Sequence, residues 1–163
     1  SMNMYGKEYK FARLTSWYGE SNTSYKFSGV TLNAHDWNKS KDLLYIKDKI
    51  NNICNEDFNS VLLNLYRDGN DYISWHSDNE KELGINPTIA SLSLGNSKIF
   101  RIRRMDNHST KYDIEFRHGS LLIMKGETQH HWEHTIPRRS DNKLSLFDKS
   151  NEIKRINLTF RKM

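Results

Sequence analysis

The part of the chain from residue 60 to residue 162 reads as a series of short β-strands, and this pattern limits the possible folds more than any other feature. The runs end at turn pairs such as Asp68-Gly69, and they lie at 60–67, 88–94, 98–104, 111–117, 120–125 and 152–162. Short strands with turns at regular spacing are typical of β-sandwiches and β-barrels. One helix, expected over about Asp36–Ile53 with His35-Asp36 as its N-cap, comes first and would pack outside the strands.

The last of these strands has two chemically different faces, because side chains alternate between the two sides of a strand. One face is apolar and carries Ile156, Leu158 and Phe160. The other face is mainly polar and carries Ile153, Arg155, Asn157, Thr159 and Arg161. If the apolar face belongs to the barrel wall, the polar face lines either water or a ligand cavity.

Size and composition favour one intracellular domain. The chain has 163 residues, of which 36% are hydrophobic, and this suits a single hydrophobic core. It has no apolar run near the ~20 residues that span a bilayer, and its polar N-terminus lacks the apolar core of a signal peptide. We therefore expect a protein of the nucleus or cytoplasm with no membrane partner. Cys54 is the only cysteine, so we expect no intramolecular disulfide and no zinc site of several thiolates, and we expect Cys54 in the helix core.

The chain is basic, with 25 Lys and Arg residues against 20 Asp and Glu and a formal net charge of +5. This excess favours approach to a polyanion such as nucleic acid, but it identifies no partner. The arginines gather at Arg101, Arg103 and Arg104 and at Arg138-Arg139. One interpretation is therefore a basic barrel that binds nucleic acid without catalysing a reaction.

His76 and Asp78 lie two positions apart, and on a regular strand their side chains would share a face and could reach one metal ion. The segment QHHWEHTIP offers a third ligand in His130, His131 or His134. Two histidines and one carboxylate on one face of an octahedron are the ligand set of non-haem Fe(II) oxygenases. The alternative is that His76 and Asp78 are merely the polar face of a strand.

The polar face of the last strand suits a dicarboxylate. A keto acid such as 2-oxoglutarate chelates iron at one end, and a guanidinium can bind its far carboxylate through two hydrogen bonds. Arg155 and Arg161 are candidates for this task. In isolation, two strand arginines equally fit a solvated face.

The motifs NLYRDG, HSDNE, HGSLLIMKGETQHHWEHTIP and RINLTFRK, in that order, resemble the AlkB family of Fe(II)- and 2-oxoglutarate-dependent nucleic acid dealkylases. The likeness is strongest to the branch that repairs double-stranded DNA. YGKEYKFARLTSWYGE and TSYKFSGVTL look like its substrate-recognition segment. The resemblance implies a mainly β (α+β) fold, a double-stranded β-helix or jelly-roll barrel with a flanking helix. It implies one domain over 1–163, with recognition over about 1–34 and catalysis over about 60–163.

The resemblance also implies the site. Iron would be held by His76, Asp78 and His134, and no further protein group would be needed for catalysis. Arg155 would bind the far carboxylate of 2-oxoglutarate and Arg161 the end near the metal. The rest of the 2-oxoglutarate pocket would be formed by Asn64, Tyr66, Asn157 and Thr159. His131 would shape the site and His130 would lie on the surface.

The resemblance implies a substrate side as well. Phe27 and the ring of His76 would enclose a flipped base, and Glu80 would face its exocyclic amine. Tyr25 and Ser28 would line the same pocket. Tyr5, next to Met4, would be a wedge between bases. Arg13 would contact the nucleic acid backbone or the complementary strand.

The activity implied is oxidative demethylation of 1-methyladenine or 3-methylcytosine in DNA by a monomer. The reaction uses Fe(II), 2-oxoglutarate and O2 and releases formaldehyde and succinate. An RNA demethylase with the same chemistry is the alternative, and a protein or small-molecule hydroxylase fits the substrate residues less well. There are two departures from the family pattern. Asn79 stands where the relative has a second aspartate, which bears on substrate preference and on the rigidity of the site. The loop RRMDNHSTKYD is shorter and less basic, which bears on the preference for duplex DNA.

Overall fold

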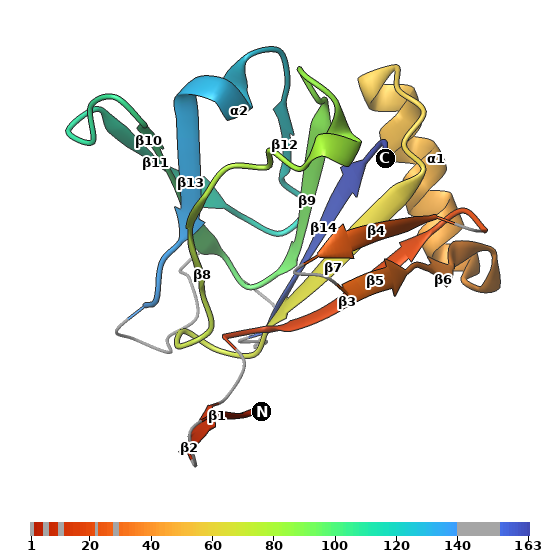
Figure 1. The fold of residues 1–163 in the computed structure, drawn as a ribbon, viewed down its shortest axis with the longest axis horizontal. Helices are drawn as coiled ribbons and strands as arrows, with labels where there is room; N and C mark the ends of the chain where they lie inside the picture. The colour runs from red at the N-terminus through yellow and green to blue at the C-terminus, as the bar shows by residue number, and fades with distance from the viewer. Residues whose placement is uncertain (1, 5–6, 10–11, 22, 28–29, 140–153) are drawn as a thin grey trace.

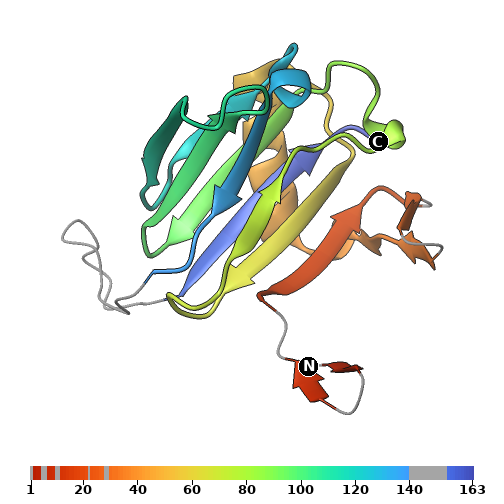
Figure 2. The ribbon, with the colours of Figure 1, turned by 60° about the vertical axis from the view of Figure 1, so that its left-hand side comes forward.

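Two β-sheets lie face to face in the computed structural model, which describes residues 2–4, 7–9, 12–21, 23–27, 30–139 and 154–163. The major sheet has the strand order β12-β9-β14-β7-β3-β6 and the minor sheet has the order β11-β10-β13-β8 (Figures 1 and 2). The strands of the two sheets are β3 (Leu14–Gly19), β6 (His35–Asp36), β7 (Ser60–Tyr66), β8 (Ile73–His76), β9 (Ile89–Gly95), β10 (Lys98–Arg104), β11 (Lys111–Phe116), β12 (Leu121–Met124), β13 (Trp132–Ile136) and β14 (Arg155–Arg161).

The eight strands from β7 to β14 form the jelly roll. The chain crosses repeatedly between the sheets, since β7, β9, β12 and β14 lie in the major sheet and β8, β10, β11 and β13 in the minor sheet. All pairings among these eight strands are antiparallel. The predicted jelly-roll barrel with a flanking helix is therefore confirmed.

Two further strand pairs come from the N-terminal region. The first joins β1 (Met2–Met4) to β2 (Lys7–Tyr9), and the second joins β4 (Ser24–Phe27) to β5 (Val30–Asn33). Figures 1 and 2 show the first pair apart from the two sheets. None of the helices among the described residues has the length and hydrophobicity needed to cross a bilayer.

The helix α1 (Lys41–Cys54) covers the outer face of the major sheet. The Ser40 hydroxyl caps it by accepting a hydrogen bond from the Leu43 N–H. The expected N-cap at Asp36 is wrong for α1, because Asp36 caps the separate 3-10 helix η1 (Trp37–Lys39) through the N–H of Asn38.

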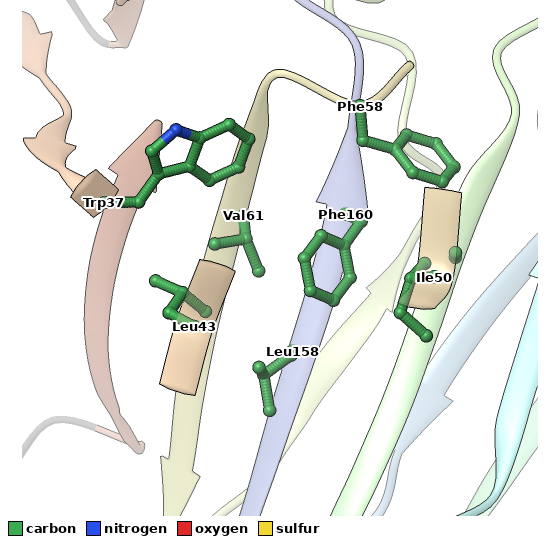
Figure 3. Packing of buried hydrophobic residues seen from close by; sticks show 8 residues of the cluster. Trp37, Leu43, Ile50, Phe58, Val61, Leu158 and Phe160 are labelled. Atoms are coloured by element: carbon green, nitrogen blue, oxygen red, sulfur yellow. The ribbon is translucent and has the colours of Figure 1, made fainter. Parts of the chain in front are cut away.

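The main hydrophobic core lies between α1 and the sheet (Figure 3). Leu158 and Phe160 of β14 contribute to it, as the two-faced strand predicted, and Cys54 packs against it partly buried. The third apolar residue of that face, Ile156, does not belong to this cluster and is 40% exposed. The buried residues labelled in the figure are Trp37, Leu43, Ile50, Phe58, Val61, Leu158 and Phe160.

The opposite, polar face of β14 points between the two sheets. Arg155, Asn157 and Thr159 are all buried there. A second apolar cluster fills one part of this space, with Tyr66, Ile89, Phe100, Phe116, Met124 and Ile136 among its members. The polar face therefore lines an interior cavity. The sequence left open whether this face lines water or a ligand cavity.

Candidate active site

His76, Asp78 and His134 meet at the minor sheet. His76 ends β8, and it pairs across the sheet with His134 of β13. Nε2 of His76 lies 4.0 Å from Oδ1 of Asp78, and Nε2 of His134 lies 3.9 Å from Oδ2. One potential ligand atom from each residue falls within 4.8 Å of the others. The strand argument for pairing His76 with Asp78 is wrong, because β8 ends at His76 and Asp78 lies in the segment that follows.

Neighbouring groups hold these side chains in forms that can bind a metal. Nδ1 of His76 lies 2.8 Å from the carbonyl oxygen of Ser74. A carbonyl only accepts, so Nδ1 carries the hydrogen and Nε2 is left with its lone pair. The Asp78 N–H donates to Oε1 of the buried Gln129 at 2.8 Å. His134 stacks on Phe100, with ring centroids 5.1 Å apart.

The electrostatics also favour ligand forms. Burial would raise the pKa of Asp78, but Arg161, His134 and His76 oppose this effect and hold its pKa below the usual value. Burial is the main cause that lowers the pKa of His134 to about 4. At neutral pH the site therefore presents a carboxylate and a neutral imidazole, the protonation states that metal binding requires.

Two chambers meet at His76 and Asp78, and His134 lines the inner one. The inner chamber, of about 50 Å³, extends between the sheets to Arg155. The outer chamber is wider, about 460 Å³, and is lined by residues of β3 and by the segment after β8. Both are lined by Leu62, Ile73, His76, Asp78 and Arg161. A metal held by the triad would therefore stand between two separate binding spaces.

Arg155 lines the inner chamber and is only 1% exposed. Its Nη2 donates to the Ser93 hydroxyl at 2.8 Å. Its Nε and Nη1 are buried and have no hydrogen-bond partner among the described residues. Its guanidinium lies over the ring of Tyr66 at 5.1 Å, and burial lowers its pKa. A buried cation with unused donors is costly unless an anion binds there, so this residue fits the far carboxylate of a dicarboxylate.

The other inner-chamber residues form a hydrogen-bonded row. Asn157 donates to the Ser91 hydroxyl at 2.7 Å and accepts from Thr159 at 2.8 Å. Sequence reasoning missed Ser91 and Ser93, although the alternation of serine and leucine in SLSL indicates two polar residues on one face. Asn64 and Tyr66 also line this chamber, and the Nε of Arg161 is buried there without a partner among the described residues.

The outer chamber contains Glu80, whose Oε2 is buried and has no hydrogen-bond partner in the described part of the chain. Arg13 lies on the wall of this chamber, where its Nε donates to Oδ1 of Asn64 at 2.8 Å. Sequence reasoning missed Thr15 and Trp17, which line the chamber from alternate positions of β3. Of the other expected substrate contacts, Tyr5 and Ser28 and the side chains of Tyr25 and Phe27 lie outside the described residues.

The expected role of His131 is wrong. His130 and His131 belong to the short helix α2 (Thr128–His131) and both are exposed. His130 contacts the Ile85 carbonyl, and His131 lies 3.5 Å from Glu127. Gln129 is the residue of α2 that reaches the metal site. His130 and His134 lie on different elements, and only His134 belongs to the group that could hold a metal.

The arginines of β10 are paired with carboxylates. Arg101 pairs with Asp113 at 2.5 Å, Arg103 with Glu133 at 2.6 Å and Arg104 with Asp106 at 2.7 Å. The first and third of these pairs lie within the β10–β11 hairpin. The positive charge that the sequence concentrates here is therefore largely neutralised locally.

Comparison with known proteins gives a consistent result. Residues 2–161 match the family described as the 2OG-Fe(II) oxygenase superfamily. The chain is 40% identical to the Bos taurus alpha-ketoglutarate-dependent dioxygenase alkB homolog 3, over 94% of this chain and 52% of that protein. It is 34% identical to the Homo sapiens DNA oxidative demethylase ALKBH2, over 99% of this chain and 60% of that protein.

A solved structure described as that of OsALKBH1 has the same fold. It aligns with a TM-score of 0.61 and 18% sequence identity, over 94% of this chain and 79% of that chain. The chain spans only about half the length of the alkB homolog 3 proteins that it matches.

Proposed function

The chain belongs to the 2OG-Fe(II) oxygenase superfamily, and from this membership we propose that it is an oxidative nucleic acid demethylase. Its substrates would be N-methylated bases of the 1-methyladenine and 3-methylcytosine type in DNA. Relatives named DNA oxidative demethylase ALKBH2 support this assignment. The observation that carries it is the meeting of two chambers at His76 and Asp78, which form a possible metal-binding group with His134.

The donor set fits Fe(II) and 2-oxoglutarate. Two histidines and one carboxylate leave positions open on the metal, and the unused donors of Arg155 call for an anion in the inner chamber. With O2, the bound iron and 2-oxoglutarate supply the oxidation of a methyl C–H bond, giving succinate and carbon dioxide. The chain's own task is to bind and orient both reactants.

In the inner chamber, Arg155 binds the far carboxylate with donors that its guanidinium leaves unused, while the Ser93 hydroxyl accepts a hydrogen bond from its Nη2. Arg161 lies at the metal end, where it also holds Asp78. The remaining polar contacts come from Asn64, Tyr66, Asn157 and Thr159. The polar rows on β7, β9 and β14 hold these groups at fixed spacing, because the three strands are paired.

In the outer chamber, Glu80 selects the damaged base. Methylation at N1 of adenine or N3 of cytosine makes the base cationic, and a carboxylate with one buried oxygen that has no partner among the described residues favours a cation. The base would lie against the ring of His76, with Phe27 on its other side. Once its methyl group is hydroxylated, the nitrogen-linked hydroxymethyl group leaves as formaldehyde, so no protein nucleophile is needed.

Two other functions predict different behaviour. An RNA demethylase would share both chambers and differ in its contacts with the sugar. A non-catalytic binding protein would not need the triad. That the protein acts as a monomer in one domain, in the nucleus or cytoplasm, stays a prediction.

The test uses oligonucleotides that carry one 3-methylcytosine or 1-methyladenine, as single-stranded DNA, double-stranded DNA and RNA, with Fe(II), 2-oxoglutarate and air. Mass spectrometry follows the loss of one CH2 unit. We expect loss on DNA by the natural chain and by the exposed-histidine variant His130→Ala, and none by His76→Ala. Activity that survives in His76→Ala, or no activity on any strand, refutes the proposal.

A further inference from the structure

Arg13 connects the two chambers. Its backbone comes just before β3, and its side chain lines the outer chamber. Its Nε reaches Oδ1 of Asn64 at 2.8 Å, and its Nη1 reaches the carbonyl oxygen of Tyr72 at 3.4 Å. Asn64 is 4% exposed and lines the inner chamber. The guanidinium of Arg13, in the wall of the outer chamber, is therefore hydrogen-bonded directly to a residue in the wall of the inner chamber.

This contact determines the orientation of the Asn64 side-chain amide, that is, whether its oxygen or its NH2 group faces Arg13. A guanidinium has donors but no acceptor, so the Asn64 amide must turn its oxygen to Arg13. Its NH2 group, which can only donate, is then left for the inner chamber. A donor is what an anion in that chamber needs, whereas a carbonyl oxygen would repel it.

The surroundings hold Arg13 in this position. The Tyr72 N–H donates to the carbonyl oxygen of Ala12 at 2.9 Å, which ties the segment before β3 to the segment before β8. β3 and β7 are paired, with Thr15 opposite Asn64. The charge of Arg13 also acts on the inner chamber: burial raises the pKa of Tyr66, while Arg155 and Arg13 lower it in part.

We propose that Arg13 assists the binding of 2-oxoglutarate by orienting the Asn64 amide. It is then a positioning residue rather than primarily a contact to nucleic acid. This inference rests on the proposed function, since it assumes 2-oxoglutarate in the inner chamber. It differs from the expectation that Arg13 contacts the nucleic acid backbone or the complementary strand, because the contact lies inside the protein. It also makes a prediction that requires no nucleic acid.

The experiment measures 2-oxoglutarate binding by calorimetry, with Mn(II) in place of Fe(II) and without nucleic acid. We expect Arg13→Met to weaken binding about tenfold, because a buried amide loses a charged hydrogen-bond partner. Arg13→Gln, a milder change, should weaken it in the same direction. The matched control is Arg138→Met, which removes an arginine that stacks on the other partner, Tyr72, at 4.3 Å. Urea unfolding of each variant checks that it is folded.

A double variant distinguishes the positioning of the Asn64 amide by Arg13 from a direct effect of the Arg13 charge on 2-oxoglutarate binding. In an Asn64→Leu background the amide is absent, so Arg13→Met should weaken 2-oxoglutarate binding no further. Equal binding by the natural chain and Arg13→Met would overturn the inference and leave the proposed function intact. A further loss in the Asn64→Leu background would overturn it in favour of a charge effect. If the natural chain itself fails to bind 2-oxoglutarate, the inference and the proposed function both fall.

Discussion

Nη2 of Arg161 donates a hydrogen bond of 2.7 Å to Oδ1 of Asp78, joining the end of the last strand to the segment after β8. The two residues are 83 positions apart in the chain. Asp78 is almost completely buried, and Arg161 is the cation that balances it. The pair therefore keeps a metal-binding carboxylate ionised before any metal arrives.

Removing Arg161 should destabilise the metal-free protein more than the metal-bound one. Arg161→Met leaves a buried carboxylate without its cation, which costs about 3–5 kcal/mol of unfolding free energy. A divalent metal would replace part of the lost charge. Urea unfolding with and without Mn(II) checks this, and an equal loss under both conditions would contradict the assigned ligand role of Asp78.

Gln129 should be needed for tight metal binding although it is not a ligand. It accepts a hydrogen bond from the Asp78 N–H, and it lies on α2 just ahead of the strand that carries His134. We expect Gln129→Leu to weaken Co(II) or Mn(II) binding about tenfold, as is usual when a supporting contact is lost. Metal titration measures the effect, and Gln129→Glu, which keeps an acceptor, should retain more affinity. The neighbouring change Thr128→Val should leave affinity unaltered.

Glu80 should discriminate cationic bases from neutral ones. Glu80→Gln keeps the shape of the side chain but removes its charge, so we expect the KM for a 3-methylcytosine oligonucleotide to rise about tenfold. 2-Oxoglutarate binding should not change, since Glu80 lines only the outer chamber. Glu82→Gln, on the exposed side of the 3-10 helix η2 (Lys81–Leu83), is the control. An unchanged KM in Glu80→Gln would exclude Glu80 from base recognition.

Lys98 should make stability rise with pH. Its Nζ donates to the Asp71 carbonyl at 2.8 Å, and burial, with Arg155 and Arg139 nearby, lowers its pKa from 10.5 to about 8. Between these values the unfolded chain binds more protons than the folded one, so the unfolding free energy contributed by Lys98 increases as pH rises from about 8.

Solvent screening limits this contribution to about 1–2 kcal/mol. Urea unfolding of the natural chain and of Lys98→Met checks it between about pH 8 and pH 10.5, the range between the two pKa values. The difference between the two proteins should shift in favour of the natural chain as pH rises. A difference that is constant with pH would show that Lys98 keeps its ordinary pKa.

The sequence predicted those parts of the site that depend on strand periodicity. The polar face of β14 could be predicted because alternation alone puts Arg155, Asn157, Thr159 and Arg161 on one side. The resemblance to the AlkB family, confirmed by relatives at 34–40% identity, selected His134 from three histidines.

Contacts between distant segments could not be predicted in this way. Gln129 looks like any polar residue of a short helix, and its bond to Asp78 depends on how β8 and α2 pack together. Arg13 and Asn64 are 51 positions apart, and only the pairing of β3 with β7 brings them together. The helix start at Ser40 was missed because Asp36 has an equally good capping side chain, and it is used by η1.

The most direct test of the account is whether Fe(II) and 2-oxoglutarate bind together at the triad. Under anaerobic conditions, a 2-oxo acid that chelates Fe(II) through its keto and carboxylate oxygens gives a visible charge-transfer absorption. We predict this absorption for the natural chain and for the control His130→Ala, and its loss in His134→Ala. If the natural chain lacks the absorption, or His134→Ala keeps it at full strength, the site described here does not hold the reaction centre.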